Sequence, residues 1–230
     1  MQSQSRLVPL LALGLVGAAI LAAIVSISVG EEGPAPPVEG SQTVQRLYGG
    51  IEQEGNSLGS PDAPVTISIF NDVQCTECAD YHLETVPGLV EDLVRRGDAR
   101  LEFRNRPVGQ TPTTLAALAA TAAGKQGVEW QYAHLIFLNL DQVETSGVTD
   151  EFLERVAASV PGPEFDIERW QRDRDDPETE ARVQSDDELG AELRVAAPAV
   201  VVDGPGGTRQ LEDARSLAEI ERAVVEVRGG

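Results

Sequence analysis

The chain has 230 residues, 41% of them hydrophobic, which is enough apolar content for one domain with an added segment or for two small domains. Its formal net charge of −20 at pH 7 argues against binding to nucleic acid and against electrostatic attachment to anionic lipid. Composition therefore excludes two classes of partner, but it identifies no substrate.

The N-terminal segment is predicted to be a membrane anchor. Residues 7–30 carry no charge, with Arg6 before them and two glutamates after them, and about 20 apolar residues suffice to cross the hydrocarbon core. We expect residues 1–30 to form a transmembrane helix with its N-terminus in the cytoplasm. A signal peptide cleaved near Ser28, which would give a secreted protein, is the alternative. Either way the rest of the chain is extracytoplasmic, where disulfides persist.

Residues 31–60 are rich in Gly, Pro, Glu, Ser and Gln, a composition that predicts a mostly flexible tether with an ordered edge around residues 44–48. The β-branched run at residues 65–70 predicts a central strand. Residues 75–96 predict a helix with Pro87 inside it, and the alternating residues 100–104 predict a second strand.

The second half of the chain is predicted to be mainly helical. Residues 111–190 read as an almost continuous series of helices. Strand signals return at residues 199–202 and 208–211, on either side of a Gly- and Pro-rich turn, and an amphipathic helix covers residues 216–227. The order is therefore strand, helix, strand, helical block, strand, strand, helix, which is an α/β arrangement.

The only two cysteines, Cys75 and Cys78, form a C-x-x-C pair at the predicted start of the helix after the first strand. A disulfide closing so short a loop stabilises a fold by only about 2 kcal/mol, so stabilisation is a poor explanation for the cysteine pair. At a helix start, one cysteine can attack as a thiolate while the other resolves. The alternatives are an inert disulfide or a metal site with His82 and His134, although these histidines lack the close spacing of structural zinc sites.

Several segments of the sequence resemble the DsbA-like branch of the thioredoxin superfamily. They are residues 59–65, 70–75 and 78–82, residues 122–127 with Trp130 and His134, and residues 195–204. The resemblance implies a thioredoxin fold over residues 61–227, interrupted by a helical insertion at residues 111–193 and preceded by the N-terminal transmembrane segment.

The same resemblance implies roles for individual residues. Cys75 would be the nucleophile and Cys78 the resolving cysteine, while Pro198 would be a cis-proline opposite the pair. Ala197 would offer backbone hydrogen bonds to an extended substrate. Thr76, Glu77, Asp72 and a half-buried His82 are candidates for redox tuning or substrate contact. No cofactor and no metal are expected.

Two positions depart from the family pattern. Glu77 places a carboxylate beside Cys75, which should raise the pKa of the Cys75 thiol and make the disulfide less oxidising. Ile69 occupies the position, six residues before Cys75, where the family often has a buried acid that handles the proton of the resolving cysteine. Asp72 is the nearest substitute.

The function expected from this resemblance is that of an extracytoplasmic thiol–disulfide oxidoreductase that introduces disulfides into exported proteins. Its substrates would be unfolded or reduced exported proteins, and a membrane quinone-linked partner would reoxidise it. A disulfide reductase or isomerase is one alternative, and a non-enzymatic tethered module for binding or metal delivery is another.

Overall fold

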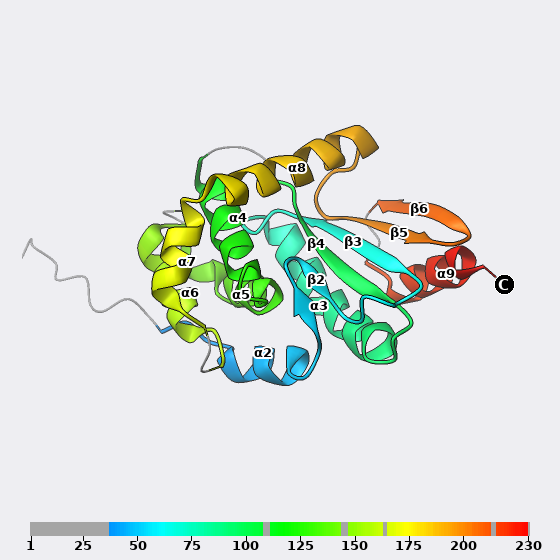
Figure 1. Ribbon diagram of the computed structural model, residues 1–230, viewed down its shortest axis with the longest axis horizontal. Helices are drawn as coiled ribbons and strands as arrows, with labels where there is room; N and C mark the ends of the chain where they lie inside the picture. The colour runs from blue at the N-terminus through cyan, green and yellow to red at the C-terminus, as the bar shows by residue number, and fades with distance from the viewer. Residues whose placement is uncertain (1–36, 108–110, 144–146, 163–164, 213–214, 230) are drawn as a thin grey trace, which may run out of the picture. The chain divides into compact units, whose positions relative to one another are not determined.

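A six-stranded mixed sheet with strand order β1-β2-β4-β3-β5-β6 runs through the computed structural model (Figure 1). The structure describes residues 37–229 except 108–110, 144–146, 163–164 and 213–214. The expected anchor at residues 7–30 lies outside this range. Within the described residues, no helix has the length and apolar character needed to cross a bilayer.

The centre of the sheet is the pair β3 (Thr66–Asn71) and β4 (Arg100–Asn105), which are parallel. They are joined by α3 (Thr76–Leu89) and a turn of π-helix, η1 (Val90–Val94). Antiparallel β5 (Ala199–Gly204) pairs with β3 on its other side, and β6 (Gly207–Glu212) completes that edge. The strands predicted at residues 65–70, 100–104, 199–202 and 208–211 are therefore confirmed.

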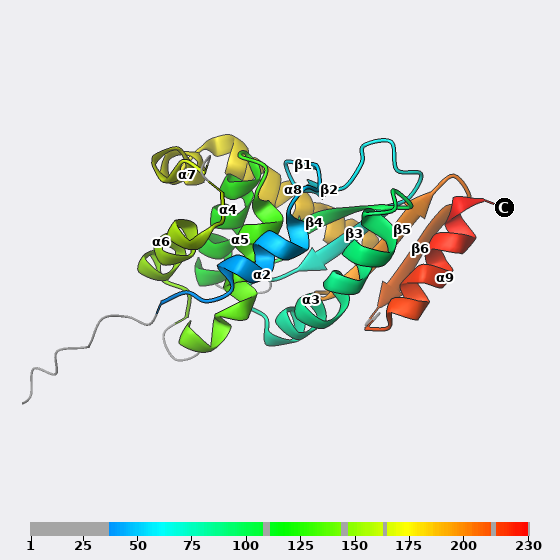
Figure 2. The same cartoon turned by 90° about the horizontal axis from the view of Figure 1, so that it is seen from below.

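The two faces of the sheet are covered by different helices (Figure 2). Ile67 and Ile69 alternate along β3 onto the face packed by α3 and by the C-terminal helix α9 (Leu217–Arg228). Phe70 faces the other way, into a smaller cluster with side chains of α8 (Pro177–Leu193). Because both faces are covered, β3 is apolar on both sides where it approaches the cysteines.

Residues 37–60 form part of the domain, so the flexible tether expected at residues 31–60 is wrong for this portion, apart from the ordered edge expected around residues 44–48. They contain α2 (Ser41–Tyr48) and the short strands β1 (Gln53–Glu54) and β2 (Ser57–Leu58), and β2 pairs with β4. Val44, Tyr48 and Leu58 are fully buried. Burial of these three large side chains offsets the entropy cost of ordering a segment that is otherwise polar.

The helical block lies between β4 and β5 and gathers mainly at one end of the sheet (Figures 1 and 2). Its members are α4 (Thr111–Gly124), α5 (Glu129–Leu138), the 3-10 turn η2 (Leu140–Val143), α6 (Asp150–Ser159), α7 (Ile167–Arg174) and α8. The side chains of Thr149, Asp166 and Asp176 cap the last three helices by accepting backbone N–H groups. The prediction of a mainly helical stretch is confirmed.

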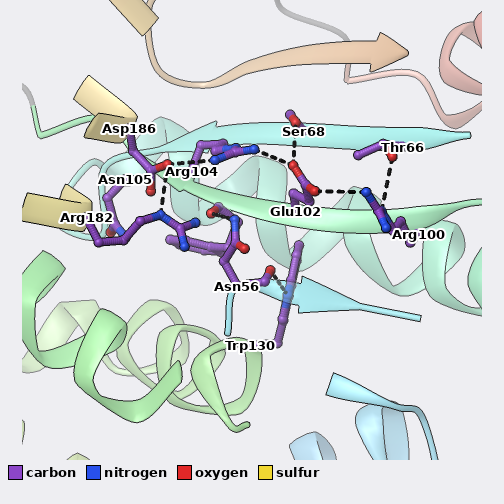
Figure 3. Close-up of polar contacts among 11 residues, drawn as sticks. Asn56, Thr66, Ser68, Arg100, Glu102, Arg104, Asn105, Trp130, Arg182 and Asp186 are labelled. Atoms are coloured by element: carbon purple, nitrogen blue, oxygen red, sulfur yellow. Dashed lines mark hydrogen bonds and ion pairs between the residues drawn. The ribbon is translucent and has the colours of Figure 1, made fainter. Parts of the chain in front are cut away.

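A buried ion-pair network fixes α8 onto β4 (Figure 3). Asp186 of α8 is only 1% exposed and accepts a hydrogen bond from Arg104 Nη1 at 2.9 Å. Its carboxylate also accepts the Arg182 Nε–H at 3.3 Å and the backbone N–H of Asn105 at 3.3 Å. Arg104 pairs in addition with Glu102 on the same strand. The network therefore holds the last helix of the block against the central sheet.

Asp186→Ala should lower the free energy of unfolding by about 3 kcal/mol, because removing one partner of a buried ion pair leaves the other charges uncompensated. Urea unfolding of the purified domain measures this. The matched control is the neighbouring Asp187→Ala, whose carboxylate is 42% exposed and pairs with Arg106. The control should cost less than about 1 kcal/mol. Equal losses in the two variants would contradict this view of the network.

Candidate active site

Cys75 is the N-cap residue of α3, directly after the loop that follows β3. Its backbone is extended, with φ −84° and ψ 121°, and its Sγ accepts the backbone N–H of Cys78 at 3.2 Å. The first N–H groups of a helix have no partner within the helix, so they are available to a negatively charged sulfur at the N-cap. The fold thus places the first cysteine where a thiolate is stabilised.

The two thiols are free in the structure and differ sharply in environment. A hydrogen bond with the Cys78 side chain is the main cause that lowers the pKa of Cys75, to about 7, and the N–H groups of Cys78 and Glu77 add to it against partial burial and the nearby Asp72. The same thiol–thiol hydrogen bond, together with burial, raises the pKa of Cys78 far above its usual range. In the reduced pair, Cys75 is therefore the sulfur that ionises and Cys78 is the one that keeps its proton.

Asp72 supplies the carboxylate that opposes ionisation of both thiols. It is 4% exposed, its backbone N–H donates to Cys78 Sγ at 3.5 Å, and its Oδ1 accepts the N–H of Gln74. The sequence had assigned this opposing effect to Glu77. The Glu77 side chain is instead exposed in the first turn of α3, and its backbone N–H lowers the Cys75 pKa. Asp72 is therefore a carboxylate that acts on Cys75 in the structure, and the role expected of the Glu77 carboxylate stays a prediction.

The Ala197–Pro198 peptide bond is cis, as the resemblance implied. β5 begins one residue later, with Ala199 opposite Phe70 near the end of β3. Pro198 consequently lies at the same end of the sheet as the loop that carries Cys75. Ala197 and Cys75 are both half-buried and both pack at the margin of the main apolar cluster. Thr76 and Glu77 are exposed beside Cys75, so solvent and substrates can approach the pair from this side.

His82 is fully buried, which corrects the expectation of a half-buried histidine able to contact substrate. Its Nε2 hydrogen-bonds the Tyr48 hydroxyl at 3.3 Å, and the same hydroxyl bonds His134 Nδ1 at 2.9 Å. The His82 ring also lies 5.9 Å from Trp130 and 4.7 Å from Phe137, measured between ring centroids. The face of α3 that carries His82 packs toward α5 and β4, so this side chain belongs to the core.

The two histidines hydrogen-bond Tyr48, and Cys75 Sγ accepts a hydrogen bond from the backbone N–H of Cys78. No set of three or more His, Cys, Asp or Glu side chains among the described residues is arranged to hold a metal ion. The aromatic residues Trp130, Tyr132 and Phe137 are buried as well, as expected of core residues.

A family model described as thioredoxin matches residues 52–224 of this sequence. The chain belongs to the thioredoxin family. The "probable disulfide bond formation protein D" of Bacillus anthracis is 29% identical over 151 residues, which cover 64% of this chain and 69% of the relative.

Solved structures give the same fold. The oxidised form of BdbD from Bacillus subtilis has a TM-score of 0.66 and 24% identity, and the match covers 78% of this chain and 98% of that one. DsbA from Chlamydia trachomatis has a TM-score of 0.64 and 22% identity over 75% of this chain and 91% of that one. The predicted thioredoxin fold with a helical insertion and the resemblance to DsbA-like proteins are confirmed.

Sequence reasoning missed the roles of two buried residues. Tyr48 was expected in an ordered edge of the tether around residues 44–48, but its hydrogen bonds with His82 and His134 were not predicted. Glu129 was passed over as the first residue of a helix, and it is a fully enclosed carboxyl group. Nothing in its local sequence indicates burial, because acidic residues are common in the exposed first turn of helices.

The buried histidines should make the domain less stable in acid between about pH 6.5 and pH 4. Burial lowers the pKa of His134 to about 4, and burial together with His134 lowers that of His82 well below its usual value. At these two positions the unfolded chain binds protons first as the pH falls, so the stability they give above about pH 6.5 is lost. His134 alone should contribute a loss of about 3 kcal/mol in urea unfolding, while Glu129, whose burial raises its pKa to about 8, acts in the opposite sense over part of this range.

His134→Phe should remove that part of the pH dependence, whereas Tyr48→Phe, which keeps both imidazoles, should retain it. If His134→Phe and the native protein show the same slope of stability against pH, the buried histidine is not the cause.

Asp72→Asn should lower the pKa of Cys75, because it removes the carboxylate that disfavours the thiolate. The ultraviolet absorbance of the thiolate, followed against pH in the reduced protein, measures the change. Glu77→Gln is the matched control and should move the titration less, since its carboxylate is exposed to solvent. A larger shift in Glu77→Gln would restore the role that the sequence suggested for that residue.

Proposed function

We propose that this protein is an extracytoplasmic thiol–disulfide oxidoreductase that introduces disulfides into exported proteins. The observation that carries the proposal is the asymmetry of the pair: Cys75 is half-buried with a pKa of about 7, and Cys78 is fully buried with a strongly raised pKa. The Bacillus anthracis relative is named for disulfide bond formation, which supports the same chemistry.

The reaction begins with the pair in its disulfide form. A substrate thiolate attacks Cys75 Sγ, the accessible sulfur, and the Cys75–Cys78 bond breaks as a mixed disulfide forms. Cys78 leaves as a thiolate and takes up a proton. A second substrate thiolate then attacks the substrate sulfur of the mixed disulfide and releases Cys75. The substrate has lost two electrons and two protons, and the pair has gained two electrons.

The stabilised Cys75 thiolate acts in this direction. A disulfide is more oxidising when its reduced form is stabilised, so each group that lowers the Cys75 pKa raises the reduction potential. The helix N-terminus and the Cys78 thiol act in that sense, and Asp72 and partial burial act against it. A pKa of about 7 equals that of the reductant thioredoxin, so the support for the oxidase direction comes from the relatives named for disulfide bond formation.

The surroundings of Cys75 suit an extended substrate. Ala197, before the cis-Pro198, offers its backbone groups beside the pair, and exposed Thr76 and Glu77 form the adjacent surface. The expected anchor at residues 1–30 would keep the domain outside the cytoplasmic membrane and near a membrane quinone-linked partner that reoxidises the pair. Cleavage near Ser28 would instead release it.

Cys78→Ala should trap mixed disulfides when its Cys75 thiolate attacks a disulfide of an unfolded protein and displaces one of the two sulfurs, because no Cys78 thiol remains to resolve them. Electrophoresis without reductant, followed by mass spectrometry of the linked peptides, detects them. Cys75→Ala is the matched control and should trap none, since Cys78 is buried. Trapping through Cys78 alone would overturn the assignment of the nucleophile.

The reduction potential tests the direction of the reaction. A value clearly above that of thioredoxin, about −270 mV, is expected for an oxidase. A value near that of thioredoxin would identify a reductase. Retention of stoichiometric zinc or copper, without oxidation of any reduced protein, would instead identify a metal-delivery module.

A further inference from the structure

Arg106 joins three segments at the end of the sheet where the cysteine pair lies. Its backbone N–H donates to the Asn71 carbonyl at 2.8 Å, at the end of the strand that leads to Cys75. Its Nη1 donates to the carboxylate of Asp187 on α8. Its Nε donates to the Val195 carbonyl oxygen at 3.5 Å, in the segment between α8 and β5. One residue therefore connects β3, the helical insertion and the approach to the cis-proline.

The Arg106 side chain lies against the backbone of α8, and this contact requires a glycine. A Cβ atom at Gly190 would stand 2.6 Å from Arg106 Cδ and 3.3 Å from Phe70 Cδ1. Any larger residue at this position would therefore push the Arg106 side chain aside. The Arg106 side chain is 23% exposed, so protein contacts cover most of it. Gly190 and Arg106 thus pack together near the end of α8.

The end of α8 directs the chain toward the cis-proline. Arg194 is in the left-handed region, with φ 58° and ψ 35°. Its N–H donates to the Ala191 carbonyl at 3.1 Å, and the Val195 N–H donates to the Gly190 carbonyl at 3.0 Å, which is the Schellman pattern. The Val195 side chain is 3% exposed and packs with Phe70. Since its N–H, its side chain and its carbonyl all have partners, Val195 is a fixed point.

Residues 196–198, here called the cis-proline loop, depend on their flanks for position. Ala196 is exposed and Ala197 is half-buried. Within the part of the chain that the structure describes, the backbone groups of these two alanines make no hydrogen bond. They are thus free to pair with an extended substrate, but they do not fix the loop. One flank is β5, which pairs with β3, and the other is Val195, which Arg106 holds.

We propose that Arg106 is a positioning residue that holds the cis-proline loop opposite Cys75, so that an extended peptide can pair with the loop while its sulfur reaches Cys75. This rests on the proposed function. The backbone of Arg106 is fixed to the strand that leads to the nucleophile, and its guanidinium is fixed to the segment that leads to Pro198. A planar guanidinium donates in several directions at once, so it can hold a carboxylate and a carbonyl together. Arg106 acts through the loop and takes no part in the exchange of electrons.

The reactivity of the pair toward a peptide and toward a small thiol tests the proposal. The disulfide form of the full chain is mixed with an unstructured peptide that carries two reduced cysteines, the reaction is stopped by acid, and oxidised peptide is quantified by mass spectrometry. In Arg106→Met the rate constant should fall about tenfold, because a loop displaced by about 1 Å aligns the peptide poorly. Reduction of the same disulfide by dithiothreitol should change by less than about twofold, since this small dithiol does not need the loop.

Arg95→Met is the matched control. Arg95 also joins a carboxylate to a backbone carbonyl, through Nε to Glu91 at 3.0 Å and through Nη2 to the Leu47 carbonyl at 2.7 Å. It follows η1, at the opposite end of the α3–η1 segment from Cys75. In this variant the ratio of the peptide rate constant to the dithiothreitol rate constant should equal that of the native protein.

Two further variants separate positioning from a general loss of structure. Gly190→Ala keeps the guanidinium but crowds it, and should lower the ratio in the same sense as Arg106→Met. Arg106→Lys keeps the charge that faces Asp187 but not the planar fork, and should restore only part of the ratio. A native ratio in both Arg106→Met and Gly190→Ala would overturn the proposal, and so would equal losses toward peptide and dithiothreitol.

Hydrogen exchange makes the test independent of the peptide substrate. Backbone N–H groups in residues 195–200 should exchange faster in Arg106→Met than in the native protein or in Arg95→Met. If the native protein reacts with dithiothreitol but oxidises no peptide, the proposed function fails, while exchange still decides whether Arg106 holds the loop. Unchanged exchange in Arg106→Met would contradict the proposal even where peptides are oxidised.

Discussion

The hydrogen bonds received by Cys75 Sγ at the start of α3 are the interaction on which the chemistry depends. They exist because a short loop leads from β3 into α3, so that Cys75 is the N-cap and the backbone N–H of Cys78 in the first turn faces its sulfur. A helix that started one residue earlier or later would place a different side chain in that position. The sheet, the covering helices and the cis-Pro198 turn all serve to hold this junction in one geometry.

The helical block supplies part of the site and is more than a cover for it. Its α8 is joined to β4 by Asp186, and its α5 carries the carboxyl group of Glu129 to the ends of β3 and β4. The loop before α6 also reaches the active-site loop, since the N–H of Val148 donates to Gln74 Oε1. The thioredoxin core and its insertion are thus joined by hydrogen bonds at this end of the sheet.

The parts of the fold that were predictable from the sequence have strong local signals. The β-branched run of β3, the C-x-x-C spacing and the proline before β5 each indicate one structure without reference to the rest of the chain. The segment from residue 37 to residue 60 was not predictable from composition, because three buried side chains outweigh many polar ones. The full burial of His82 and Glu129 was not predictable for a related reason. Which face of a helix is buried depends on the elements packed against it, and here these come from the insertion and from α2.

Tyr48 sets a limit on where this domain can begin. Its hydroxyl is the shared partner of His82 on the active-site helix and His134 on the insertion, so three distant segments meet at one oxygen. A chain shortened to residue 61, where the family resemblance would place the start, loses this oxygen and the strand that covers β4. Two buried imidazoles would then lose their shared hydrogen-bond partner. Residues 37–60, which follow the expected membrane anchor in the sequence, are therefore a packed part of the catalytic domain.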